Sequence, residues 1–156
     1  MSALRGRKAV IAKLGFDAHW RGAILIANAL RNAGMEVVYL GHATAEQIAR
    51  VVVQEDADLL GLSTLSGNHI EECPGVVAQL RAAGADDVVV VAGGTIPAAD
   101  AALLAAAGIA DVFPTGSSLP DVITRLERLL VAQEEQRRPA DAAARDLAAQ
   151  TTGGST

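Results

Sequence analysis

A carboxylate and an imidazole lie two residues apart in the segment KLGFDAHWRGA, residues 13–23. A bond from Asp17 to one ring nitrogen of His19 would fix the tautomer of the ring and make its other nitrogen more basic. That arrangement suits a histidine that ligates a metal, and it suits an oriented general base equally well. Lys13, four residues before Asp17, could pair with the carboxylate and keep it ionised. A single D-x-H tripeptide also occurs by chance in solvated loops, so the pattern needs support from its neighbours.

Other chemistries for these residues fail at specific positions. A nucleophilic serine at Ser63, with His69 as its base, would want a G-x-S-x-G elbow, which GLSTL does not match. Zinc would require His42 to reach across to Asp17 and His19, although His42 reads more simply as a surface residue. The segment GFDAHWRG does not match the dinucleotide fingerprint, and a phospho-receiver domain would need an aspartate where Ser63 stands.

The elements that position these residues follow an alternating pattern. Five times an apolar run precedes a helical pattern, which predicts strands at 7–14, 35–41, 57–63, 87–94 and 109–114. Thr44 and Gln47 have the spacing of a capping box at the start of the second helix, and Pro97 is expected to open the fourth. Because the strands are almost continuously apolar, they should be buried on both faces of a parallel sheet. The prediction is a single α/β domain with a flavodoxin-like (Rossmann-like), doubly wound, five-stranded parallel sheet.

In such a sheet the C-terminal ends of all strands lie at one edge. Ligands bind there, at the switch point between the first and third strands. The loops that reach this edge read GFDAHWRG, STLSGNH, GGT and TGSS, and each is small, polar or rich in glycine. Four loops with so few bulky side chains predict a site for a large ligand.

Composition narrows the class of protein. The 156 residues carry a formal net charge of −5 and a pI near 5.1, which argues against binding to nucleic acid or to an anionic membrane. The chain has a single cysteine, Cys73, and no apolar run long enough for a signal peptide or a membrane span. We therefore expect a cytoplasmic protein. Residues 1–132 are expected to form the domain, and residues 133–156 a helical extension with a disordered tail.

With these residues in place, the chain from about Lys8 to Leu130 closely resembles the cobalamin (B12)-binding domain of adenosylcobalamin-dependent acyl-CoA mutases. Each motif of that family is weak alone, but three of them occur here at matching positions of one fold. The D-x-H-x-x-G motif is matched by Asp17, Ala18, His19, Trp20, Arg21 and Gly22, the S-x-L motif by Ser63, Thr64 and Leu65, and the G-G pair by Gly93 and Gly94.

The resemblance implies that His19 takes the lower coordination position of the cobalt, in place of the cofactor's own dimethylbenzimidazole (the base-off/His-on form). Asp17 would bond to His19, and Lys13 would follow as the next member of this relay. The freed nucleotide tail would enter a deep slot in the domain. The residues expected to contact the cofactor are Asp17, Ala18, His19, Trp20, Arg21, Gly22, Ser63, Leu65, Ser66, Gly93, Gly94, Thr115, Gly116 and Ser117.

The K-x-G-x-D-x-H pattern resembles methylmalonyl-CoA and 2-hydroxyisobutyryl-CoA mutases more than glutamate mutase. The chain departs from it at Ala18, where the family usually has glycine, and at Trp20, where it usually has aspartate. In this family a large barrel domain holds the acyl-CoA, and no such domain lies within these 156 residues. The resemblance therefore implies a small subunit that needs a large acyl-CoA-binding subunit for its radical 1,2-rearrangement and is inactive alone. The alternative function is a non-catalytic corrinoid carrier for methyl transfer, or a cobalamin-based sensor.

Overall fold

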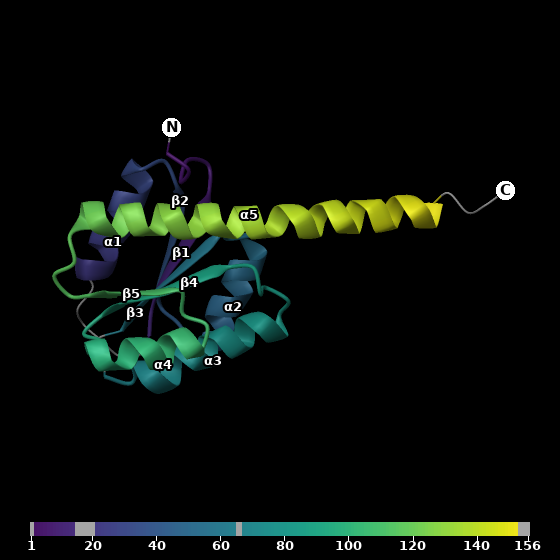
Figure 1. The fold of residues 1–156 in the computed structure, drawn as a ribbon. Helices are drawn as coiled ribbons and strands as arrows, with labels where there is room; N and C mark the ends of the chain where they lie inside the picture. Colours follow the sequence, from purple (N-terminus) through teal and green to yellow (C-terminus); the bar gives the residue numbers. More distant parts are fainter. Residues whose placement is uncertain (1, 15–20, 65–66, 153–156) are drawn as a thin grey trace.

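The computed structural model describes residues 2–14, 21–64 and 67–152. Five strands form one parallel sheet in the order β2-β1-β3-β4-β5 (Figure 1). The strands are β1 (Lys8–Lys13), β2 (Glu36–His42), β3 (Leu59–Thr64), β4 (Val89–Gly94) and β5 (Asp111–Pro114). This order is flavodoxin-like, with its switch point between β1 and β3. The predicted fold class is confirmed.

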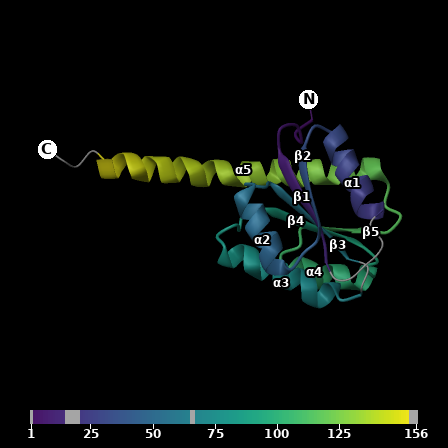
Figure 2. The ribbon, with the colours of Figure 1, turned by 180° about the vertical axis from the view of Figure 1, so that it is seen from behind.

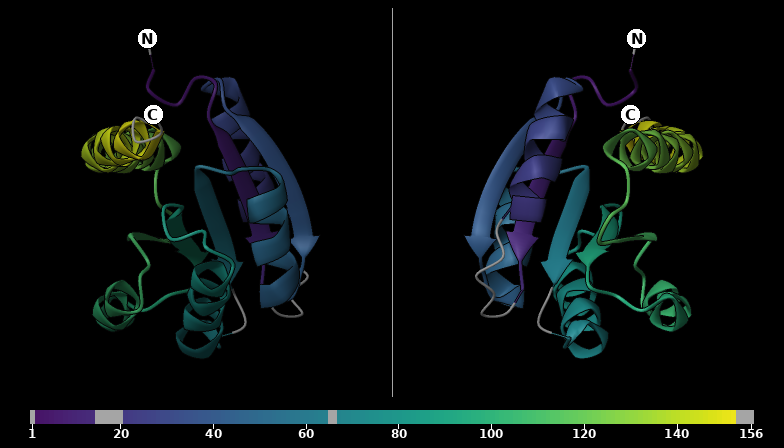
Figure 3. Two further views of the ribbon diagram at one scale, coloured as in Figure 1. Left: turned by 90° about the vertical axis from the view of Figure 1, so that its right-hand side faces the viewer. Right: turned by 90° about the vertical axis from the view of Figure 1, so that its left-hand side faces the viewer.

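Helices cover both faces of the sheet (Figures 1 and 3). On one face lie α1 (Arg21–Asn32) and α5 (Leu119–Thr152), and on the other lie α2 (Ala45–Gln54), α3 (His69–Ala82) and α4 (Ala101–Ala106). Successive strand residues alternate between the two layers. Val10 and Leu60 pack against α2 and α3, whereas Ala9 and Leu59 face α1 and α5. The strands are thus buried on both sides, as their continuous apolar runs predict.

Local sequence explains the helix starts. Thr44 and Gln47 form the predicted capping box, in which each side chain accepts a hydrogen bond from the other residue's backbone N–H. The fourth helical segment differs from the prediction of one helix that opens at Pro97. Pro97 is extended, and a 3-10 turn, η1 (Ala98–Asp100), precedes α4. Such turns are common at helix N-termini, where the first N–H groups have no partner within the helix.

The last helix, α5, runs from Leu119 to Thr152 and extends well beyond the sheet (Figures 1 and 2). Its first turns pack on the core through Val122, Leu126 and Leu130, and residues 134–151 are all exposed. The division of the chain at residue 132 stays a prediction. In the part of the chain that the structure describes, no helix combines the length and the apolar character that crossing a bilayer requires.

Candidate functional site

A cavity of about 840 Å³ lies within the layer that α1 and α5 build on the sheet. Its floor consists of alternate residues of neighbouring strands, all facing the same side: Ile11, Leu59, Gly61, Ser63, Val91, Gly93 and Phe113. Ile26 and Leu30 of α1 line one wall, and Val122 and Leu126 of α5 line another. Because the lining spans β3 from Leu59 to Ser63, the cavity follows almost the full length of that strand.

The polar end of this cavity lies at the C-terminal edge of the sheet. Eight of the residues predicted to contact a ligand come together there from four segments of the chain: Arg21, Gly22, Ser63, Gly93, Gly94, Thr115, Gly116 and Ser117. Hydroxyl and backbone groups at this edge can hydrogen-bond a polar ligand. Ser117 also stabilises its own turn, because its Oγ donates to the carbonyl oxygen of Pro114 at 2.6 Å. The site therefore has an apolar interior and a polar mouth.

Of the other residues considered for the site, the structure describes Lys13 and His42. Lys13 ends β1, has only 2% of its surface exposed, and stands in register between His42 of β2 and Ser63 of β3. This places the lysine at the switch point of the sheet, while its pairing with Asp17 stays a prediction. His42 is exposed at the end of β2. Six predicted residues lie outside the described residues: Asp17, Ala18, His19, Trp20, Leu65 and Ser66.

Gly94 is needed where β3 and β4 pair. Its φ angle is +125°, and a Cβ atom at this position would lie 2.0 Å from the carbonyl oxygen of Thr64 on β3. The resemblance implied only that Gly94 contacts the cofactor, whereas the structure shows close approach by the neighbouring strand. Gly94 is therefore required for the last pair of the β3–β4 ladder, Thr64 with Gly94.

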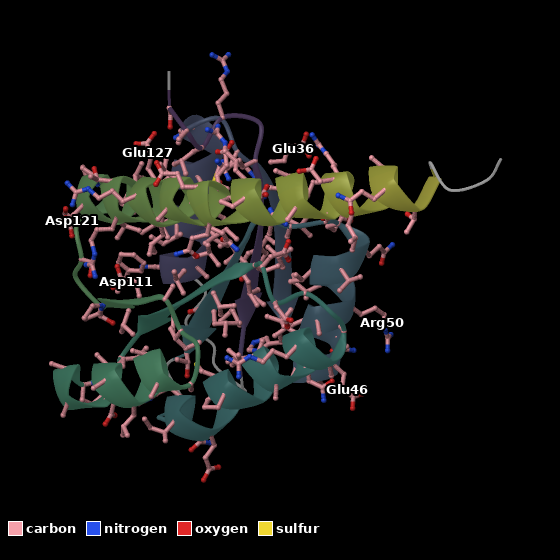
Figure 4. All side chains as sticks on the ribbon, turned by 45° about the vertical axis from the view of Figure 1, so that its right-hand side comes forward. Glu36, Glu46, Arg50, Asp111, Asp121 and Glu127 are labelled. Carbon is pink, nitrogen blue, oxygen red and sulfur yellow. The ribbon has the colours of Figure 1, made fainter. Side chains whose placement is uncertain are left out.

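Ionic contacts fix the wall that β5 and α5 form. Arg125 of α5 donates from Nε to Oδ2 of Asp111 at 2.9 Å and from Nη2 to Oδ1 of the same carboxylate. Its guanidinium lies 4.5 Å from the centre of the Phe113 ring, which lines the cavity. Asp111 lies beneath the start of α5, where Asp121 is the second acidic neighbour of Arg125 (Figure 4). The hydrogen bond to Asp111 raises the pKa of Arg125 above its ordinary value.

Reasoning from the sequence missed the apolar floor of the cavity. One signal was available: Gly61 interrupts an apolar strand, and glycine inside a strand often marks close approach of another group. A Cβ atom at this position would lie 2.7 Å from Cδ1 of Ile11, so a larger residue would crowd the floor. The apolar residues of α1 and α5 carried no such signal. The same spacing of apolar residues is expected on a helix that packs directly against the sheet and on a helix that faces an apolar cavity.

The two residues considered for a nucleophilic pair do not combine. Ser63 faces the cavity, whereas the side chain of His69 is buried at the start of α3 and bonds Asp100 at 2.7 Å. The structure therefore does not place His69 as a base for Ser63.

Comparison with known proteins identifies the family to which the domain is similar. A family model described as "B12 binding domain" matches residues 7–123. The chain is 38% identical over 127 residues to the 2-hydroxyisobutanoyl-CoA mutase small subunit of Aquincola tertiaricarbonis, covering 81% of this chain and 93% of that protein. It is 38% identical over 120 residues to the pivalyl-CoA mutase small subunit of Xanthobacter autotrophicus, covering 76% of this chain and 80% of that one.

Longer relatives match over one part only. Methylmalonyl-CoA mutase of Escherichia coli is 36% identical over 127 residues, which make up 81% of this chain and 18% of the longer protein. Among solved structures, a cobalamin-binding protein from Desulfitobacterium hafniense aligns with a TM-score of 0.68 at 22% identity, covering 80% of this chain and 59% of that one. A receiver domain from Mycobacterium tuberculosis aligns with a TM-score of 0.63 at 14% identity, covering 81% and 97%. These two similarities show a shared fold.

Proposed function

The chain belongs to the B12-binding domain family, and from that membership we propose that it binds adenosylcobalamin as the small subunit of a two-component acyl-CoA mutase. Relatives that match over most of their length are named as mutase small subunits. The observation that carries the proposal is the cavity, which opens at the edge where this fold binds ligands.

The cavity fits a cofactor with a long tail that is apolar at its end and polar along its length. Its volume of about 840 Å³ lies within the range of enclosed ligand sites. The interior between Leu30, Leu59 and Leu126 suits a flat heterocycle, and the mouth offers the hydroxyls of Ser63, Thr115 and Ser117 to polar atoms. Gly93 has no side chain to fill the cavity at the point where the apolar interior meets the polar mouth.

Adenosylcobalamin, when bound, supplies the radical chemistry of a carbon-skeleton rearrangement. The chain's own work is to hold the tail, to orient the ring system and to keep water from the apolar slot. His19 is expected to ligate the cobalt, with Asp17 fixing its tautomer and Lys13 keeping that carboxylate ionised. The rearrangement itself requires a separate large subunit that holds the acyl-CoA and closes over the same edge.

The visible spectrum of retained cofactor tests the proposal. The protein is mixed with adenosylcobalamin and washed, beside His19→Ala and the control His42→Ala, an exposed histidine at the end of β2. We expect the parent protein and His42→Ala to retain a base-off/His-on spectrum that His19→Ala loses. Identical retention by all three proteins would contradict the role of His19. If none retains cofactor even when mixed with a large mutase subunit, the proposed function is wrong.

A further inference from the structure

A buried imidazole–carboxylate pair links two segments at the edge that carries the cavity mouth. His69 is the first residue of α3, and Asp100 is the last residue of η1. The Nε2 atom of His69 lies 2.7 Å from Oδ2 of Asp100, across 31 positions of sequence. Only 4% of His69 is exposed, and Asp100 is partly buried. The bond therefore joins the segment that follows β3 to the segment that follows β4.

The bond determines the orientation of the ring. A carboxylate accepts hydrogen bonds, so Nε2 carries the proton that it donates to Asp100. Among the residues that the structure describes, neither the buried Nδ1 atom of His69 nor the buried Oγ1 atom of Thr64, at the end of β3, has a hydrogen-bond partner. Within the described part of the chain, Asp100 is thus the hydrogen-bond partner on which the position of the His69 ring depends. When the single hydrogen-bond partner of a buried polar group is removed, the group stays buried and unsatisfied, and this lowers the stability of the local structure.

The position of the pair relates it to the cavity. The β3–β4 ladder ends with Ser63 beside Gly93 and Thr64 beside Gly94. Ser63, Gly93 and Gly94 line the cavity on the side of α1 and α5. Thr64 is buried, and the strand alternation turns its side chain to the layer of α2, α3 and α4. His69 and Asp100 close the gap between the two segments after the ladder ends, on the face opposite to the cavity.

We propose that His69 and Asp100 are a positioning pair, which holds the ends of β3 and β4 at a fixed spacing and so keeps the cavity mouth in the form that binds cofactor. The pair itself touches no ligand in this proposal; it acts through Ser63, Gly93 and Gly94. The proposal rests on the proposed function, because it names which further residues determine the affinity for cobalamin.

The variants separate the hydrogen bond from the bulk of the side chains. Asp100→Ala and His69→Leu each remove the bond, whereas His69→Gln places an amide N–H near the position of Nε2 and can keep it. Glu71→Ala serves as the control, since it removes an exposed carboxylate from the same first turn of α3. Two properties are measured: the dissociation constant for adenosylcobalamin by visible titration, and backbone amide exchange of residues 67–69, 95–96 and 98–100 in the cofactor-free protein.

We expect Asp100→Ala and His69→Leu each to raise the dissociation constant about tenfold. The double variant should be no weaker than either single variant, because both remove one bond. His69→Gln and Glu71→Ala should stay within about threefold of the parent protein. Amide exchange in both segments should be faster in Asp100→Ala.

Three results would overturn the proposal: unchanged exchange in both segments of Asp100→Ala, an unchanged dissociation constant in that variant, or an additive loss of affinity in the double variant. Failure of the parent protein to bind cobalamin, even when mixed with a large mutase subunit, would instead overturn the proposed function, and with it the role of the pair in affinity. The exchange measurement on cofactor-free protein still decides in that case whether the pair links the two segments.

Discussion

Replacement of Gly94 by alanine tests whether this glycine serves the sheet before it serves any ligand. The new Cβ would come within 2.0 Å of the carbonyl oxygen of Thr64 and 2.9 Å of its carbonyl carbon, both backbone atoms that cannot rotate away. The φ angle of +125° adds strain of about 1–3 kcal/mol for a residue with a side chain. Forcing β3 and β4 apart adds about 1–3 kcal/mol more. We therefore expect Gly94→Ala to lose about 4 kcal/mol of unfolding free energy.

Gly116→Ala is the matched control for this change. Gly116 also has a positive φ angle, +90°, but no atom of the described part of the chain lies within 4 Å of the position that its Cβ would occupy. It should lose only the conformational part, about 1–2 kcal/mol. Urea denaturation of the cofactor-free proteins, followed by far-UV circular dichroism, measures both losses. A loss in Gly94→Ala no larger than that in Gly116→Ala would refute the argument from close approach.

Three further changes test other parts of the site. Gly22 lies in the first turn of α1, and no described residue has an atom within 4 Å of the position that its Cβ would occupy. Gly22→Ala should raise the free energy of unfolding by about 0.5 kcal/mol yet weaken cobalamin binding in titration. Arg125→Met should lower the free energy of unfolding by about 1.5 kcal/mol in thermal unfolding, since solvent screening limits the partly exposed pair with Asp111 to about 1 kcal/mol and the contact with Phe113 adds about 0.5 kcal/mol. The control Arg128→Met, at an exposed position of the same helix, should lower it by less than about 0.5 kcal/mol. Equal losses in the two variants would contradict this prediction. Burial raises the pKa of the Cys73 thiol from 9.0 to about 12, so on raising the pH the unfolded chain loses this proton before the folded protein does. The free energy of unfolding should therefore fall by about 1.4 kcal/mol per pH unit above pH 9. Cys73→Ala should lack this slope.

The sequence predicts those features that local pattern determines. The capping box at Thr44 and Gln47, the five alternating units and the shared edge of four loops all follow from residue type and spacing over a few positions. The His69–Asp100 bond could not be predicted in this way, because it joins residues 31 positions apart. Its geometry exists only after β3 and β4 have paired.

The apolar lining of the cavity is the larger omission: the resemblance implied a deep slot, but the pattern of residues did not show which side chains surround it. Hydrophobic periodicity shows which side of a helix turns inward, but it does not show whether the inward side meets another surface. Ala27 and Leu30 of α1 and Leu126 of α5 are buried as their spacing predicts. Leu30 and Leu126 also line an open space. The amount of space depends on how far the two helices stand from the sheet.

Polar contacts of α5 contribute to that distance. At the first residue of β5, Asp111 accepts hydrogen bonds from Arg125 of α5. Glu127 of α5 accepts hydrogen bonds from Oγ of Ser2 and the backbone N–H of Ala3. Beyond Leu130, the last core residue of α5, Glu134 pairs with Arg7, and Arg137 pairs with Asp58 and Asp87.

These contacts join α5 to β5 and to the segments that precede β1, β3 and β4, in addition to the core contacts of its first turns. An apolar space of this size loses dispersion contacts along its whole lining, and helices free to move would close it. The face covered by α2, α3 and α4 has a continuous core, and its ionic contacts among the described residues include His69 with Asp100 and Lys8 with Glu55. We infer that the polar contacts of α5 keep the slot open in the absence of a ligand, so that a ligand that fills it recovers the missing contacts without the need to separate α5 from the sheet.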